Sequence, residues 1–184
     1  MTDRTAATVW TGTLFEGSGT VTLESSGLVQ DAAVSWPARA EEPGGKTSPE
    51  ELIAAAHSSC YSMALSKQLA DRGTPAERLE TSVTVTFVPG TGITRSAITV
   101  RVSAPGLDDA GLEETTTAAK QGCPVSQALA DSIARSRSQI ATLEREIEQR
   151  EQEQAEARER YAYELARFRD GTCPEPETLA DSGT

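Results

Sequence analysis

Two cysteines of this 184-residue chain lie in settings that could support thiol chemistry. Cys60 lies in "HSSCYSMALS" and Cys123 lies in "KQGCPVSQ", sixty-three residues later. A thiolate at one position could be oxidised to a sulfenic acid, which condenses with a neighbouring thiol to form a disulfide. Cysteine is also among the most buried residue types, so the spacing alone equally allows two inert core thiols.

A reactive thiol in apolar surroundings needs a nearby cation, because burial otherwise raises its pKa. The basic residues near the start of the helix that contains Cys60 are Arg39 and Lys46, in the preceding loop. Arg39 is the better candidate, since a guanidinium keeps its charge and can bind a thiolate and a carboxylate together. Glu50 is a natural carboxylate to hold Arg39.

The separation of Glu50 and Cys60 limits this arrangement. Ten residues of one straight helix span roughly 15 Å, which one arginine cannot easily bridge. Either the helix begins late and Glu50 folds back, or Arg39 and Glu50 serve the Cys60 of another subunit. We favour the second alternative, in which two antiparallel helices pair in an obligate homodimer.

The elements that must position these residues begin with short strands. Residues 8–36 alternate and contain turns, which predicts a three-stranded meander. Residues 37–47 are rich in Pro, Gly and charge and predict a loop. Trp10 and Trp36 are expected in the core, at a dimer contact, or around an apolar pocket for an alkyl peroxide.

A helix is predicted to begin after the cap Ser48 and to end near Asp71. Pro49 suits the first helical position, and Glu51 completes a capping box. Apolar or small residues surround its first half, so we expect it to be buried. Ile53, Ala56, Cys60 and Met63 form one apolar stripe. His57 lies one turn before Cys60, where a hydrogen-bonded core histidine is favoured over a catalytic base.

Two further strands are predicted in "RLETSVTVTFV" and "SAITVRVSA", joined by the turn "PGTG". A second helix should begin near "PGLDDAGLEE" and end at Gly122. Cys123 and Pro124 then start a new turn or helix.

The composition changes near residue 131, where Glu, Arg and Gln replace Gly and Pro. We therefore expect three regions: 1–130, a helical extension 131–170, and a disordered tail 171–184 that contains Cys173. Residues spaced by seven give the extension coiled-coil character: Ile133, Ile140, Ile147, Gln154, Tyr161 and Phe168, with Leu143 and Leu165 as second seam positions. A solitary helix without a partner is the alternative.

Composition and charge exclude several classes of protein. The net charge of −11 disfavours nucleic acid and acidic membrane surfaces as partners. No apolar run is long enough to span a bilayer, and the N-terminus has no secretory signal pattern, so a cytoplasmic location is expected. One histidine and three cysteines without a CxxC pair predict no metal site. The short glycine motifs lack a dinucleotide fingerprint, and no cofactor is expected.

Together the segments "TSPEELIAAAHSSCYSMALS" and "KQGCPVSQAL" resemble the OsmC/Ohr family of thiol peroxidases, the OsmC branch more than the Ohr branch. The resemblance spans roughly residues 7–130. It implies an α+β fold in which an intertwined homodimer wraps antiparallel sheets around two central helices. It also implies a cofactor-free stress-response enzyme that reduces organic hydroperoxides, with a dithiol reductant such as a lipoylated protein or a thioredoxin-type donor.

Residue by residue, the resemblance implies that Cys60 is the peroxidatic cysteine and Cys123 the resolving cysteine. Arg39 then activates the thiolate, and Glu50 matches the glutamate of the family's "NPE" pattern, here "SPE". Family members end in a strand after "CPVSQAL", whereas "ADSIARSRSQ" has no strand pattern. Two other functions stay open: a scaffold protein that works through the helical extension, and a module that binds a small apolar ligand.

Overall fold

The computed structural model of the chain describes residues 1–171, and the expected tail with Cys173 lies outside the described residues. The chain divides into two compact units, Met1–Gln139 and Ile140–Thr184. The expected region 1–130 lies inside the first unit. The last helix, α4 (Pro124–Arg169), continues through the boundary.

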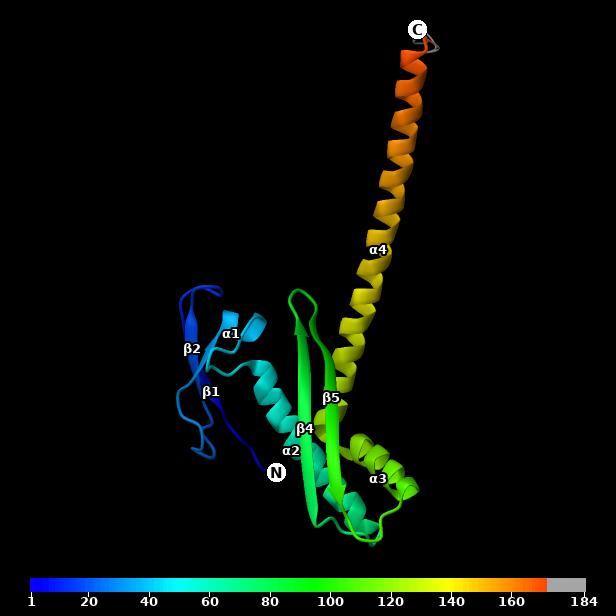
Figure 1. The fold of residues 1–184 in the computed structure, drawn as a ribbon. Coiled ribbons are helices and arrows are strands. Elements are labelled where there is room, and N and C mark those ends of the chain that lie inside the picture. Colours follow the sequence, from blue (N-terminus) through cyan, green and yellow to red (C-terminus); the bar gives the residue numbers. More distant parts are fainter. Residues whose placement is uncertain (172–184) are drawn as a thin grey trace, which may run out of the picture. The chain divides into compact units, whose positions relative to one another are not determined.

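The first unit contains two separate antiparallel sheets (Figure 1). The strands β1 (Ala7–Thr11), β2 (Ser18–Thr22) and β3 (Ala32–Ser35) form the predicted meander in that order. The strands β4 (Arg78–Val88) and β5 (Gly92–Ser103) form a long hairpin. The sequence predicted both sheets, although β5 begins earlier than expected.

Residues 37–47 are not entirely a loop, as we expected from their Pro and Gly content. The short helix α1 (Trp36–Ala40) starts the segment, and the Ser35 hydroxyl caps it by accepting the backbone N–H of Ala38 at 3.4 Å. Pro37 lies in the first helical turn, where its missing N–H is tolerated. This helix holds Arg39 in its last turn.

The central helix α2 (Pro49–Asp71) begins where the capping pattern predicts. The Ser48 hydroxyl accepts the backbone N–H of Glu51 at 3.2 Å. The Glu51 carboxylate accepts the Thr47 hydroxyl at 2.7 Å, so the pairing differs from a reciprocal capping box.

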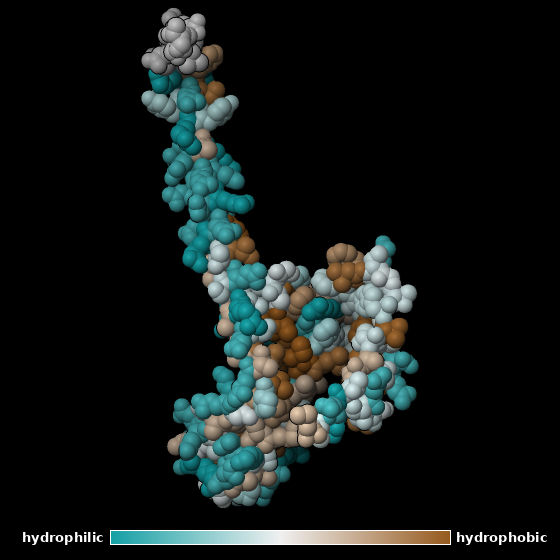
Figure 2. Space-filling view, turned by 180° about the vertical axis from the view of Figure 1, so that it is seen from behind, coloured by the Kyte–Doolittle hydropathy of each residue, from teal (hydrophilic) through white to brown (hydrophobic). Residues whose placement is uncertain are grey.

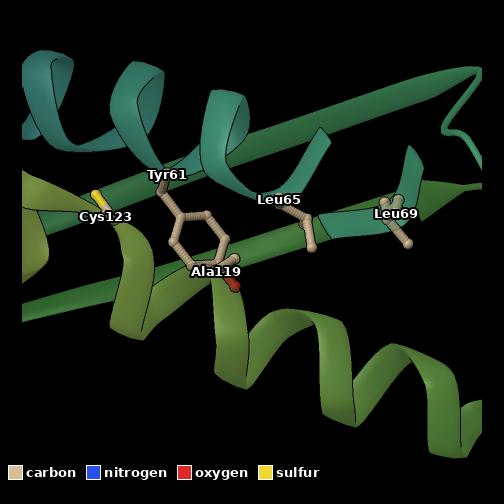
Figure 3. Close-up of a cluster of buried hydrophobic side chains, with 5 residues drawn as sticks. All are labelled: Tyr61, Leu65, Leu69, Ala119 and Cys123. Carbon is tan, nitrogen blue, oxygen red and sulfur yellow. The ribbon is translucent and has the colours of Figure 1, made fainter. Parts of the chain in front are cut away.

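The core of the first unit uses a different stripe of α2 from the one that we expected. His57, Tyr61, Leu65 and Leu69 repeat every four residues and are buried. They face the β4–β5 hairpin and α3 (Asp109–Gly122), with Ala119 and Cys123 completing the cluster (Figure 3).

The expected stripe of α2 lies largely on the surface of the single chain. Met63 keeps 67% of its surface exposed, Ala56 is exposed, and Cys60 is only half-buried. The prediction that the first half of α2 is buried is therefore wrong for the single chain. Cys60 still packs against the core, whereas Ala56 and Met63 leave an exposed apolar surface.

The C-terminal end of the first unit has no final strand among the described residues. The helix α4 begins at Pro124, directly after Cys123, where a new turn or helix was expected, and it runs without a break into the extension predicted from residue 131. Within residues 1–171 no helix is both long enough and apolar enough to cross a membrane.

Candidate active site

The structure brings the two cysteines of the first unit together. Cys60 lies in the middle of α2, and Cys123 lies between α3 and α4. Their sulfur atoms are 3.1 Å apart, and both thiols are free. A disulfide bond is about 2.05 Å long, so only a small movement separates this arrangement from a covalent link.

The position of Cys123 favours its thiolate. Cys123 is the residue before the first turn of α4, and its sulfur accepts the backbone N–H of Ser126 at 3.4 Å. Burial raises the pKa of Cys123, but hydrogen bonds from the hydroxyl and backbone of Ser126 and from Cys60 outweigh it, so the pKa lies below the ordinary value. A helix N-terminus further favours a negative charge there.

The environment of Cys60 within one subunit disfavours its thiolate. Burial raises the pKa of the Cys60 thiol, and the neighbouring Cys123 raises it further, against a smaller lowering effect from the backbone of Val125. No guanidinium is recorded among its hydrogen-bond partners in the described residues. Among residues 1–171, therefore, the expected guanidinium is not one of the partners of Cys60.

Arg39 and Glu50 instead form a pair with each other. The Arg39 Nε donates to both Glu50 oxygens, at 3.1 and 3.2 Å, and a terminal nitrogen donates to Oε1 at 2.9 Å. The guanidinium carbon lies 4.1 Å from the ring centre of Phe87, and Trp36 lies 6.0 Å away. The paired hydrogen bonds to Glu50 hold the guanidinium over the Phe87 ring and near Trp36.

The two pairs occupy different parts of α2. Glu50 lies in the first turn of the helix, and Cys60 lies ten residues later on the same uninterrupted helix. This length corresponds to roughly 15 Å of axial rise. The structure thus joins Arg39 to Glu50 and Cys60 to Cys123, but it does not join the two pairs within one chain.

His57 is a buried residue whose two ring nitrogens both have partners. Nδ1 lies 2.8 Å from the Ser96 hydroxyl, and Nε2 lies 2.7 Å from the Ser126 hydroxyl. Burial lowers the pKa of His57, which favours the neutral ring. This confirms the interpretation of a hydrogen-bonded core histidine.

Sequence reasoning missed Ser126, which connects His57 to Cys123. If the neutral His57 carries its proton on Nε2, it donates to Ser126, whose hydroxyl is then free to donate to the Cys123 sulfur. The spacing "CPVS" contained a usable signal, because it places a serine at the third position of a helix that Cys123 caps.

Two cavities border Arg39. One, of about 800 Å³, is lined by Arg39, Glu50, Ala54, Val83 and Phe87 among others. The second, of about 340 Å³, is mainly apolar and is lined by Trp10, Leu14, Trp36 and Leu52 beside Arg39. Trp10 and Trp36 thus contribute to an apolar pocket next to a cation.

Comparison with known proteins places this site in a family. The model of the OsmC-like protein family matches residues 42–136, which include Glu50, Cys60 and Cys123. The chain therefore belongs to the OsmC family, a class of α+β proteins with antiparallel sheets and a long central helix.

Individual relatives agree with this assignment. Peroxiredoxin OsmC of Escherichia coli (strain K12) is 39% identical over 127 residues, which cover 67% of this chain and 87% of the relative. The organic hydroperoxide resistance protein of Xanthomonas axonopodis pv. citri is 33% identical over 114 residues, covering 59% and 78% respectively. These values favour the OsmC branch, as the cysteine segments predicted.

A solved structure shows the same fold at lower identity. The OsmC-like protein from Mycoplasma pneumoniae aligns with a TM-score of 0.52 at 14% identity, over 70% of this chain and 88% of that protein. This likeness supports the fold of the first unit.

Proposed function

We propose that the chain is a thiol-dependent peroxidase that reduces organic hydroperoxides to alcohols. The observation that supports this most is the 3.1 Å separation of the Cys60 and Cys123 sulfurs, one of them at a helix N-terminus. The relatives named peroxiredoxin and organic hydroperoxide resistance protein support the same reaction class.

In the proposed reaction, the Cys60 thiolate attacks the outer oxygen of the hydroperoxide. The O–O bond breaks, Cys60 becomes a sulfenic acid, and the alkoxide takes up a proton and leaves as the alcohol. The Cys123 thiolate then attacks the Cys60 sulfur, hydroxide leaves and is protonated to water, and a disulfide forms.

A dithiol donor completes the proposed cycle. One donor thiolate attacks the Cys60 sulfur, and Cys123 leaves as a thiolate, which its lowered pKa favours. The second donor thiol then displaces Cys60 and closes the donor's own disulfide. A lipoylated protein or a thioredoxin-type protein has the required pair of thiols. A reducing compartment such as the cytoplasm would keep that donor in its dithiol form.

Arg39 and Glu50 are proposed to act on the Cys60 of a second subunit in a homodimer. The raised pKa of Cys60 within one chain requires a cation from elsewhere, and the exposed stripe of α2 provides a surface for a second α2. Two antiparallel α2 helices would bring residue 50 of one subunit near residue 60 of the other. A monodisperse monomer with full activity would refute this arrangement.

The substrate pocket is proposed to be the apolar cavity beside Arg39. Its walls of Trp10, Leu14, Trp36 and Leu52 suit an alkyl chain, while the guanidinium would orient the peroxide oxygens. A pocket with apolar walls and one cation favours organic hydroperoxides over hydrogen peroxide, which has no apolar group to bury.

The function is tested by peroxide consumption with a dithiol donor. Cys60→Ser is expected to abolish turnover, whereas Cys123→Ser is expected to complete at most one turnover before further oxidation of Cys60. Full multi-turnover activity in Cys60→Ser would contradict the proposal. A full-length protein inert towards tert-butyl and fatty-acid hydroperoxides would instead favour a scaffold role, which the exposed apolar residues of the last helix would support.

A further inference from the structure

The helical segment 140–169 exposes apolar side chains on a surface that is otherwise hydrophilic (Figure 2). Leu143, Ile147, Tyr161 and Phe168 keep 47%, 57%, 65% and 73% of their surface exposed. In heptad positions lettered a to g, with Ile140 at a, these four residues fall at a or d. Because a polar helix of this kind gains most of its stability from a packed apolar face, the stripe indicates a partner.

Charges beside this stripe differ between the two halves of the segment. The flanking e and g positions are acidic in the first half: Glu144, Glu146, Glu151 and Glu153. In the second half the e and g positions are basic apart from one leucine: Arg158, Arg160, Leu165 and Arg167. The segment therefore has an acidic end and a basic end along the same seam.

This charge division selects an antiparallel partner with the same sequence. In an antiparallel coil, e positions face e positions and g positions face g positions, so each acidic half meets a basic half. One register places Glu151 opposite Arg158, Glu153 opposite Arg160 and Glu146 opposite Arg167. A parallel coil would instead pair g with the following e, which brings Glu146 against Glu151 and leaves Glu153–Arg158 as its attractive pair.

The same antiparallel register pairs apolar residues at the two ends of the coil, whereas Ile147 falls opposite Glu164 in its interior. It places Leu143 of one helix opposite Phe168 of the other at both ends of the pair. Arg150 falls opposite Tyr161, where its stem and guanidinium can cover the ring. Gln154 lies at the centre opposite Ala157, a polar position of the kind that weakens a coil but fixes its register.

We propose that segment 140–169 pairs with the same segment of a second copy of this chain as an antiparallel two-stranded coiled coil. Glu151 of each helix then lies opposite Arg158 of the partner subunit, so the pair contains this contact twice. The assignment rests on the charge pattern and the exposed stripe of α4. It goes beyond the proposed peroxidase function and does not depend on it.

Hydrogen exchange of the full-length protein, followed by mass spectrometry, tests this pairing. Peptides from residues 143–168 are expected to be protected, and Glu151→Arg is expected to make their exchange about tenfold faster, because two attractive contacts become repulsive. The double variant Glu151→Arg/Arg158→Glu exchanges the two charges and is expected to restore the protection.

In an isolated helix, Glu151→Arg would have the opposite effect and slow the exchange. Glu148 lies three residues before Glu151, so the new arginine would relieve a repulsion and stabilise an isolated helix. The matched control is Glu159→Arg, at an f position on the opposite face, where Glu156 lies three residues before it and gives the same relief within one helix; it is expected not to make the exchange faster. Peptides around Cys60 and Cys123 report whether the first unit stays folded in each variant.

Three results would overturn the proposal. Slower or unchanged exchange in Glu151→Arg would exclude the Glu151–Arg158 contact, and slower exchange would indicate a parallel pair in which the new arginine meets Glu146. Failure of the double variant to recover protection would exclude the register. Protection of the segment in a protein that light scattering shows to be monomeric would exclude a second copy as the partner.

Discussion

Replacing Glu50 by glutamine tests the pair that is proposed to activate Cys60. The change keeps the shape of the side chain but removes the charge that holds Arg39 through three hydrogen bonds of 2.9 to 3.2 Å. The Glu50 side chain is 9% exposed and Arg39 is 31% exposed, so the pair is shielded from water but not fully buried.

The expected cost follows from this partial burial. Exposed ion pairs contribute up to about 1 kcal/mol, and hydrogen bonds to charged groups contribute about 1.5–3 kcal/mol. We therefore expect Glu50→Gln to lower the free energy of unfolding by about 2 kcal/mol, a factor of roughly 30 in the folding equilibrium. In urea this shifts the midpoint by about 1 M.

The assay compares urea unfolding and peroxidase turnover for Glu50→Gln and Glu51→Gln at one protein concentration. Glu51 is the neighbouring carboxylate, is exposed, and accepts a hydrogen bond from the Thr47 hydroxyl. Its replacement is expected to change stability by less than about 0.5 kcal/mol and to leave turnover intact. Equal behaviour of the two variants in both measurements would refute a special role for the Arg39–Glu50 pair.

Three further predictions follow from the buried groups. Ser126→Ala, made in a Cys60→Ser background, should raise the pKa of Cys123, seen as a shift of its alkylation profile to higher pH; an unchanged profile would remove the role of the Ser126 hydroxyl. His57 is the single histidine, so NMR can follow its ring directly, and its pKa should lie below the ordinary value of 6.5. A lowered pKa of His57 contributes stability that is present above pH 6.5 and is lost as the pH falls through the pKa of the folded protein. His57→Gln should therefore lose less stability in acid than the unchanged protein. An equal loss in both proteins would contradict this. Leu65→Ala should cost about 3–5 kcal/mol in urea unfolding, since the side chain is fully buried, and a cost below about 1 kcal/mol would contradict that packing.

Local signals in the sequence predicted much of the fold. The serine–proline cap fixed the start of α2, and alternating β-branched residues predicted β4 and β5. These signals depend only on neighbouring residues. The short helix α1 was missed because Pro and Gly in residues 37–47 favour a loop, while Ser35 and Pro37 provide a helix start that is only one turn long.

Contacts between distant segments were harder to predict. The sequence selected the stripe with Cys60 and Met63 as core, whereas the stripe with Tyr61 and Leu65 is buried against α3 and the hairpin. Both stripes of α2 are apolar or small, so periodicity could not separate them. The Ser126 contact with His57 depends on a helix that begins at Pro124, and the sequence left open whether a turn or a helix follows Cys123.

Thiol titration with mass spectrometry, before and after one equivalent of cumene hydroperoxide, tests the central claim most directly. The account predicts that the reduced protein has free Cys60 and Cys123, and that one equivalent of peroxide converts them to a disulfide between these two residues. Its formation should be lost in Cys60→Ser. A Cys60 that stays reduced, or one that oxidises without joining Cys123, would contradict the account.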